Sequence, residues 1–310
     1  MLKYILLVLK GGAMGAADVV PGVSGGTIAF ITGIYEDLLK SIRSFDLTAV
    51  KLLFSGRFAQ LWKHINGAFI FPVLFGIALS ILSLAKLMLY LLSNHAIETW
   101  SFFFGLIIAS SILVAKEIKK WNTATIISMV FGIVIAFWIT TASPSSTPND
   151  WWFIMLSGAI AICAMILPGI SGSFILLLLG KYLYIMQALN DFNLYIITLF
   201  ITGAGAGIIS FSHLLTWLLK RFHGVTIALL MGFMIGSLNK VWPWKEVLKT
   251  YTNSHGEQIP LLESNILPAQ FEALNLQPAH LALAVTMCAL GFGLILSVEW
   301  AAGYLKSNKK

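Results

Sequence analysis

Hydrophobic residues fill long blocks of this chain, and short polar segments separate the blocks. Six blocks, at about residues 67–92, 98–115, 123–141, 193–219, 224–240 and 281–300, are strongly apolar. Each is long enough to cross roughly 30 Å of hydrocarbon as a helix. The pattern therefore predicts an all-α polytopic membrane protein. Composition agrees, since 58% of the 310 residues are hydrophobic and 11% are charged, against about 25% charged in soluble domains.

Two further apolar stretches, at residues 1–40 and 151–190, are interrupted by proline, glycine and hydroxyl residues. The first contains "ADVVPGVSGGTIAFITGIY" and the second "CAMILPGISGSFILLLLGKY". Proline disfavours helix in the residue before it, and glycine permits a tight reversal. Each stretch therefore predicts a hairpin with arms of about 17 residues, which is borderline for spanning. A re-entrant, broken-helix hairpin is favoured, and two full crossings are the alternative.

The positive charges predict the topology. Fifteen of the twenty Lys and Arg residues fall in five places, namely Lys3 and Lys10; Lys40, Arg43, Lys51, Arg57 and Lys63; Lys116, Lys119 and Lys120; Lys220 and Arg221; and Lys306, Lys309 and Lys310. The positive-inside rule then puts both termini and the 40–66 loop in the cytoplasm. The 142–150 and 241–279 loops lie outside. Topology thus accounts for the net charge of +7, and no nucleic-acid partner is predicted.

The two interrupted stretches also belong to an internal repeat. Laying Pro21 on Pro168 matches "PGVSGG" to "PGISGS", and after the 40–66 loop a second register matches further glycine, threonine and serine positions. The aligned pairs are Gly33 with Gly180, Tyr35 with Tyr182, Gly76 with Gly203, Thr99 with Thr226, Gly105 with Gly232 and Ser110 with Ser237. Each half has one hairpin and three spans, and because three is odd the second half is inverted. The predicted halves are 1–142 and 151–310, joined by an outer linker at 143–150.

Hairpin tips of this composition predict an anion site. A broken helix offers free N–H donors and a positive helix end, which bind phosphate well. Ser24 and Thr27 in one tip, and Ser171 and Ser173 in the other, add hydroxyls and good N-caps. Inverted repeats with broken helices are typical of secondary transporters, whose site lies between the repeats. The alternative is that the glycines only permit close packing and the hydroxyls satisfy the backbone.

Charged residues inside membrane segments are costly and usually functional. Asp18 precedes Pro21 by three residues, and Glu36 follows Tyr35. Lys86 and His213 take equivalent positions under the second register and form a symmetrical pair of candidate cations. Lys181 lies near the outer interface, where snorkelling is an alternative for it and for Lys86. Asp18 is expected to cap the turn or to carry a proton.

The quoted residues resemble a known family. "MGAADVVPGVSGGTIAFITGIYEDLLKSI" with "ILPGISGSFILLLLGKYLYIM" is similar to the bacterial PopT membrane family. The resemblance implies transport of undecaprenyl phosphate from the outer to the inner leaflet of the cytoplasmic membrane, for recycling of this cell-wall carrier lipid. It implies site residues at Asp18, Pro21, Gly22, Ser24, Gly25, Gly26, Thr27, Gly33, Tyr35, Glu36, Pro168, Gly169, Ser171, Gly172, Ser173, Gly180 and Tyr182. The second copy departs from the first at Ser173 and at Met165, which stands where the first has Asp18.

Physical reasoning adds a coupling hypothesis. Moving a phosphate anion inward opposes an inside-negative potential by roughly 2.3 kcal/mol per charge per 100 mV. A proton carried on Asp18 or Glu36 would relieve this cost. No cofactor or metal is predicted, and the oligomeric state is left open.

Two other functions remain open on the sequence. A transporter of a small anion or of another phospholipid would have the same fold. An intramembrane serine hydrolase is the remote alternative, because "GVSGG" matches G-x-S-x-G and His213 could serve as the base.

Overall fold

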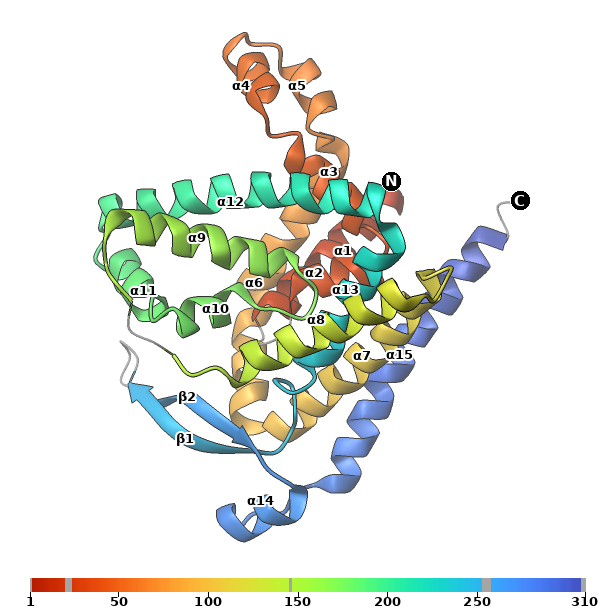
Figure 1. The fold of residues 1–310 in the computed structure, drawn as a ribbon, viewed down its shortest axis with the longest axis vertical. Coiled ribbons are helices and arrows are strands. Elements are labelled where there is room, and N and C mark those ends of the chain that lie inside the picture. The colour runs from red at the N-terminus through yellow and green to blue at the C-terminus, as the bar shows by residue number, and fades with distance from the viewer. Residues whose placement is uncertain (1, 20–23, 145–146, 253–257, 308–310) are drawn as a thin grey trace. The chain divides into compact units, whose positions relative to one another are not determined.

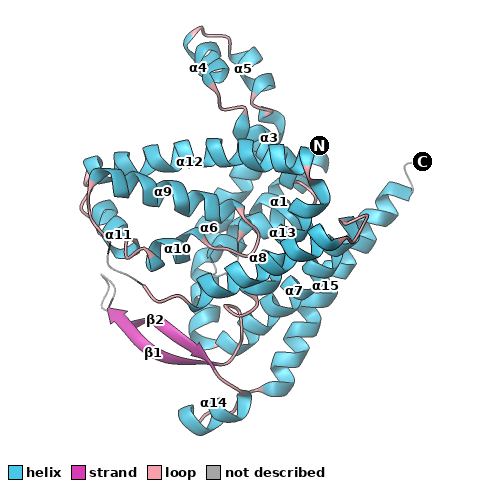
Figure 2. Ribbon diagram, viewed as in Figure 1, coloured by secondary structure: helices cyan, strands magenta, loops and turns pink. Residues whose placement is uncertain are grey.

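The protein is described here from a computed structural model, which covers residues 2–19, 24–144, 147–252 and 258–307. Within these residues it is helical apart from a two-stranded sheet (Figure 2). The chain divides into two compact units. Unit 1 contains residues 1–88 and 114–236, and unit 2 contains residues 89–113 and 237–310.

Unit 1 holds both interrupted stretches and most of the long helices (Figure 1). Its elements are α1 Leu2–Val19, α2 Gly25–Ile31, α3 Tyr35–Arg43, α4 Leu47–Phe54, α5 Phe58–His64, most of α6 Gly67–Asn94, α8 Thr123–Thr141, α9 Trp151–Ile166, α10 Gly172–Leu178, α11 Tyr182–Asn190, α12 Leu194–Arg221 and most of α13 His223–Ser237. Unit 2 holds most of α7 Ala96–Glu117, then β1 Lys245–Thr252, β2 Gln258–Asn265, α14 Pro268–Asn275 and α15 Leu281–Ser307.

Helices occupy all six blocks that the hydrophobic pattern marked as spans. In the described residues three of them, α7, α8 and α12, are individually long and apolar enough to cross a membrane. Two bent pairs would add one span each, α5 with α6 at 75° and α10 with α11 at 107°. The chain is therefore a helical membrane protein with three to five membrane-capable elements of this kind.

Glycines let the long helices of unit 1 approach closely. A Cβ atom at Gly76 of α6 would lie 2.1 Å from the carbonyl oxygen of Val8 in α1. A Cβ atom at Gly203 of α12 would lie 1.9 Å from the carbonyl oxygen of Met155 in α9, and Figure 1 shows α9 and α12 side by side. Small residues at such contacts are typical of helix packing in membranes, where hydrophobicity does not drive association. These contacts hold α1 on α6 and α9 on α12.

In the same way α8 packs on α13 in unit 1 and α7 packs on α15 in unit 2. A Cβ atom at Gly232 would lie 2.2 Å from the carbonyl oxygen of Met129, and one at Gly105 would lie 1.9 Å from that of Cys288. Glycine-mediated contact therefore recurs in each of four helix pairs.

The 241–279 loop corrects the expectation of an all-α chain. Its strands β1 and β2 pair antiparallel, from Lys245 opposite Asn265 to Thr252 opposite Gln258. Trp244 lies buried at the start of the sheet and donates its indole N–H to the carbonyl oxygen of Ala279. From the sequence this polar loop could hold either a short surface helix or a lid, and strands were not predicted for it. The short helix α14 does lie in it, together with the two strands.

A buried ion pair supports this sheet. Lys245 Nζ lies 3.3 Å from Glu263 Oε2 and 4.2 Å from the ring centre of Trp100. Lys240 Nζ contacts the same carboxylate oxygen at 3.1 Å. Burial lowers the pKa of Lys245 to about 8, because desolvation outweighs the attraction of Glu263.

Candidate functional site

Each interrupted stretch forms one long helix, a break, a short helix, a glycine turn and a second short helix. We call residues 18–35 the first break motif and residues 165–182 the second. The short helices α2 and α10 each have seven residues, and α3 and α11 each have nine. Gly33 and Gly180 end α2 and α10 with φ of +69° and +62°, a conformation that favours glycine. Pro21 and Gly22 lie outside the described residues.

The return arm of each hairpin therefore differs from the single helix of about 17 residues that was expected. In the second motif α10 and α11 are bent by 107°. The left-handed glycine explains the difference, since it ends the first short helix before the second begins. The long first arms do match the expectation, with 18 residues in α1 and 16 in α9.

A carboxylate caps the start of α2 in the first motif. Asp18 Oδ1 accepts the N–H of Gly25 at 2.7 Å, and Ser24 Oγ accepts the N–H of Gly26 at 3.0 Å. A Cβ atom at Gly25 would lie 2.5 Å from Asp18 Oδ2, so only glycine allows this approach. Asp18 therefore occupies the place at which a helix N-terminus would hold an external anion.

The first motif also bonds directly to the main chain of the second. Ser24 Oγ donates to the carbonyl oxygen of Met165 at 2.7 Å, and the hydroxyl of Tyr35 donates to that of Ile166 at 3.2 Å. Thr27 Oγ1 accepts the N–H of Gly169 at 2.9 Å. A helix leaves its last carbonyls without partners. The hydroxyls of Ser24 and Tyr35 therefore supply donors to the last two carbonyls of α9. The two predicted tips thus meet.

Close packing accompanies these bonds. Ser24 and Thr27 are each only 1% exposed. A Cβ atom at Gly26 would lie 2.3 Å from the carbonyl oxygen of Ile166. The alternative role foreseen for the glycines and hydroxyls, close packing and backbone satisfaction, therefore describes these residues of the first motif.

The start of α10 in the second motif is built differently. Ser171 takes the N-cap position but makes no side-chain cap bond, and its Oγ lies 2.9 Å from Ser173 Oγ. Ser171 is buried and Ser173 is exposed. Gly172 packs within its own half, since a Cβ atom there would lie 2.5 Å from the carbonyl oxygen of Ala161. Met165 replaces the acid, so this helix start has no carboxylate from the equivalent position.

Pro168 and Gly169 form the turn that leads into this helix. Pro168 is fully buried, and Gly169 has a φ of +86°. The positive φ directs the Gly169 N–H at Thr27, as described above. The turn is therefore part of the contact between the two motifs.

Side chains also complete the C-terminal ends of the two short helices. Lys10 Nζ donates to the carbonyl oxygen of Thr32 at 2.6 Å. In the second motif Thr147 Oγ1 donates to the carbonyl oxygen of Leu179, and buried Lys181 donates to the carbonyl oxygen of Thr147 at 2.9 Å. Cations are favourable at a helix C-terminus. The 147–149 linker thus fixes Lys181.

Four sequence candidates take no part in the contact between the motifs in the described structure. Glu36 is exposed and pairs with Lys40 of its own helix at 3.8 Å. His213 is exposed and its Nδ1 contacts the carbonyl oxygen of Ile209 on its own helix. Tyr182 is half-buried, and the side chain of Lys86 lies outside what the structure describes. No Ser24–His213 pair of the kind a hydrolase needs forms among the described residues.

The main-chain groups of this site were not predicted from the sequence. The carbonyls of Met165 and Ile166 carry no side-chain pattern, yet they accept two of the three hydrogen bonds that the described residues make between the motifs. The indication was available, because a helix that ends just before a proline in hydrocarbon must have its last carbonyls satisfied by protein.

These observations define a class, a multi-pass helical membrane protein in which two broken helices meet. The chain belongs to the undecaprenyl phosphate translocase-like family, whose model matches residues 14–259. A polyprenyl-phosphate transporter of Vibrio cholerae is 47% identical over 298 residues, which cover 96% of this chain and 97% of that protein. A polyprenyl-phosphate transporter of Staphylococcus aureus is 37% identical over 256 residues, covering 76% and 85%. No solved structure gives a significant match.

Proposed function

We propose that this protein is a flippase that moves undecaprenyl phosphate from the outer to the inner leaflet of the bacterial cytoplasmic membrane. The phosphate head would pass at the two break motifs. The observation that carries the proposal is the direct contact between two interrupted helices in a chain whose relatives are named polyprenyl-phosphate transporters. A polyprenyl tail can stay in lipid, whereas an ionised phosphate in hydrocarbon costs many kcal/mol unless it is hydrogen-bonded.

The second motif is the half that we assign to the phosphate. In the first motif the hydroxyls of Ser24, Thr27 and Tyr35 are already bonded to main chain. In the second, Ser171 and Ser173 bond to each other, and Ser173 is exposed. An N-cap hydroxyl on Ser171 and a second hydroxyl on Ser173 in the first turn, with no acid at the equivalent position, suit an anionic oxygen.

Proton coupling would act through Asp18. Its carboxylate holds the start of α2 as an internal anion at 2.7 Å from Gly25 N. An incoming phosphate would be repelled by that charge, and protonation would remove the repulsion while importing one positive charge. Asp18 is the better supported carrier, because Glu36 is exposed and paired with Lys40.

Repetition of contacts supports an inverted-repeat architecture. Val8 aligns with Met155 in the register of the first hairpin, and Gly76 aligns with Gly203 in the second register. The two glycines make the same contact to those two residues. Likewise α7 meets α15 at Gly105, and α13 meets α8 at the aligned Gly232. In this architecture both termini and the 40–66 loop lie in the cytoplasm, by the distribution of positive charge.

The test uses the full chain in proteoliposomes with labelled undecaprenyl phosphate in the outer leaflet. An impermeant phosphatase added outside measures how fast the lipid becomes protected. Ser171→Ala with Ser173→Ala should slow protection at least about tenfold, the value of one lost charge-assisted bond. The matched control is Ser83→Ala, which removes an exposed hydroxyl of α6 that bonds only to Leu79 of its own helix.

Three results would count against the proposal, and a fourth would count against proton coupling. Equal rates of lipid protection for the double variant and for Ser83→Ala would show that the second motif does not bind the phosphate. Inhibition by inorganic phosphate alone would favour a small-anion transporter, and equal protection of phosphatidic acid would favour a general phospholipid carrier. An imposed pH gradient that leaves the rate unchanged would end the coupling hypothesis.

A further inference from the structure

A short helical hairpin projects from unit 1 between α3 and α6. We call residues 45–64 the α4–α5 hairpin; it appears orange in Figure 1. Asp46 closes it, because Asp46 Oδ1 accepts the N–H groups of Thr48 and Ala49 and lies 3.0 Å from His64 Nε2. The bond from Ala49 helps to hold the pKa of Asp46 below its ordinary value. Asp46 thus joins the start of α4 to the end of α5.

The hairpin exposes large apolar side chains outside the predicted spans. Leu47 is 80% exposed, Phe54 is 86% exposed and Phe58 is 66% exposed. On α4 the exposed residues Leu47, Val50 and Phe54 are spaced i, i+3 and i+7, so they lie on one face. Single exposed apolar residues need no explanation, but a contiguous stripe marks an interaction surface.

Positive charges are interleaved with this stripe. The hairpin contains Lys51, Arg57 and Lys63 against one acid, Asp46. Lys51 follows Leu47 by four residues and so shares its face. Apolar and aromatic residues on one face with Lys and Arg beside them are the composition of helices that lie in a membrane interface. Anionic lipid attracts such segments by about 1 kcal/mol per positive charge.

The bend between α5 and α6 gives the orientation. The two helices are inclined by 75°, so a membrane-crossing α6 leaves α5 close to the plane of the bilayer. Trp62 at the end of α5 lies against Phe71 of α6, with ring centres 4.7 Å apart. Tryptophan favours the interface between headgroups and hydrocarbon. The geometry thus points the hairpin along a lipid surface.

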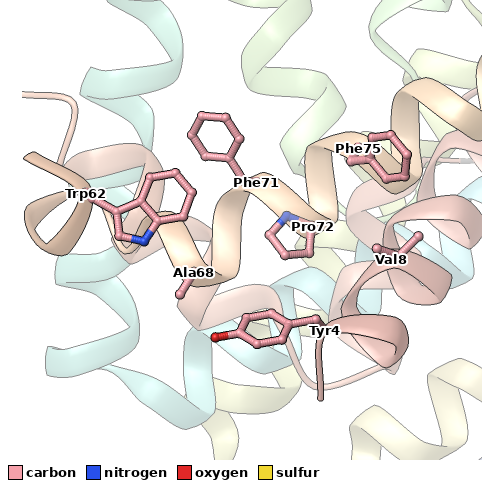
Figure 3. Close-up of a pocket in the computed structure, with 7 residues that line it drawn as sticks. All are labelled: Tyr4, Val8, Trp62, Ala68, Phe71, Pro72 and Phe75. Carbon is pink, nitrogen blue, oxygen red and sulfur yellow. The ribbon is translucent and has the colours of Figure 1, made fainter. Parts of the chain in front are cut away.

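An apolar groove continues from Trp62 (Figure 3). It has a volume of about 490 Å³ and is lined by Tyr4, Val8, Trp62, Ala68, Phe71, Pro72 and Phe75. Figure 3 shows the rings of Trp62 and Phe71 at one end and Phe75 with Val8 at the other. An open groove with this lining suits a hydrocarbon chain.

We propose that the α4–α5 hairpin binds the anionic phospholipid surface of the leaflet at which α6 begins. The stripe of Leu47, Val50 and Phe54 inserts below the headgroups, and the three positive side chains contact lipid phosphates. An acyl chain of a bound lipid fills the groove beside Trp62. The surface is distinct from the break motifs, and it does not depend on which lipid the protein transports.

The experiment places one fluorescent probe on the hairpin of the full chain. Cys163→Ala and Cys288→Ala remove the native thiols, and Phe54→Cys carries an NBD label. Vesicles of phosphatidylcholine, with or without about 30% phosphatidylglycerol, are compared. We expect blue-shifted emission and quenching by spin-labelled lipid in the anionic vesicles. Gln60→Cys is the matched control, since position 60 is exposed on α5 away from Phe58 and its probe should stay in water.

Charge removal sharpens the test. Lys51→Gln, Arg57→Gln and Lys63→Gln together should lower the equilibrium constant for insertion of the hairpin by about fivefold per charge, and high salt should lower it likewise. Identical emission from the Phe54 probe in both kinds of vesicle, with full access to a water-soluble quencher, would overturn the proposal. The proposal would also be overturned if protection of the Phe54 probe from the water-soluble quencher increased with the protein-to-lipid ratio. A second copy of the protein would then cover the stripe.

Discussion

The two break motifs share a sequence pattern and helix lengths, yet they use their polar groups differently. In the first, Asp18 and Ser24 cap α2 from within, and Ser24, Thr27 and Tyr35 bond to the second motif. The second motif mostly supplies main-chain groups to that contact. Its own serines bond to each other. The same sequence pattern thus gives one motif whose side chains make the contact and another whose hydroxyls take no part in it.

The difference depends on one position in particular. Asp18 and Met165 are equivalent in the repeat, and only Asp18 can place a negative charge at a helix start. The short helix α2 therefore has a carboxylate at its N-terminal end and the Lys10 ammonium at its C-terminal end. The equivalent position before α10 carries no acid. This difference is the reason that the proposed function assigns the phosphate to the second motif.

The largest expected effect comes from forcing the two motifs apart. Gly26→Val would place side-chain atoms against the carbonyl oxygen of Ile166, where a Cβ atom already lies 2.3 Å away. We expect a loss of about 3 kcal/mol in the free energy of unfolding, from overpacking and from strain in the bonds between the motifs. Thermal unfolding of the solubilised protein measures it.

The control is Gly205→Val, because a Cβ atom at Gly205 meets nothing within 4 Å. If the two valine variants unfolded at the same temperature, the close contact of Gly26 with Ile166 would be contradicted.

A smaller effect separates the hydroxyls of the two motifs. Thr27→Val keeps the shape of the side chain but leaves the buried N–H of Gly169 without its acceptor. An unsatisfied buried donor costs about 2 kcal/mol. Ser173→Ala removes an exposed hydroxyl and should cost under about 0.5 kcal/mol. Denaturant unfolding measures both losses of stability. In the transport assay we expect Ser173→Ala to be the slower variant, although it is the more stable one. If Ser173→Ala were less stable than Thr27→Val, the second motif and not the first would supply the side chains that maintain the contact.

The smallest structural effect is expected at Asp18. Asp18→Asn keeps an oxygen that can accept the N–H of Gly25 but removes the charge. The attraction of the helix start for the charge and the cost of burying it oppose each other, so the free energy of unfolding should change by no more than about 0.5 kcal/mol. The same variant should lose any response of transport to an imposed pH gradient, while Met165→Leu should keep it. A full pH response in Asp18→Asn would assign the proton to another group.

The hydrophobic pattern predicted the long helices well because span length is set by the bilayer. The block at 123–141 coincides with α8 Thr123–Thr141, and the block at 193–219 is close to α12 Leu194–Arg221. Proline and glycine also placed the breaks, since α9 ends at Ile166, two residues before Pro168. These features depend on local sequence and on a solvent that forbids unpaired backbone.

What the sequence did not predict depends on distant partners. Ser24, Thr27 and Tyr35 bond to main-chain atoms that are 131 to 142 residues away, and main chain has no compositional pattern. The strands β1 and β2 were not predicted, because the alternation of apolar and polar residues in "KEVLKTYT" is short and contains three charged residues. The hairpin at 45–64 was assigned only as a basic loop, since each of its helices has eight residues or fewer.

Three hydrogen bonds join the motifs in the part of the chain that the structure describes, and they have a mechanical consequence. Pulling one tip away from the other breaks all three together, at roughly 1 kcal/mol each. A separated arrangement would then make up only about 1% of the population. Rocking of both tips as a single pivot, with the surrounding helices hinging around them, avoids that penalty. In the proposed flippase the paired tips would therefore stay joined, and the helices around them would open toward one leaflet or the other.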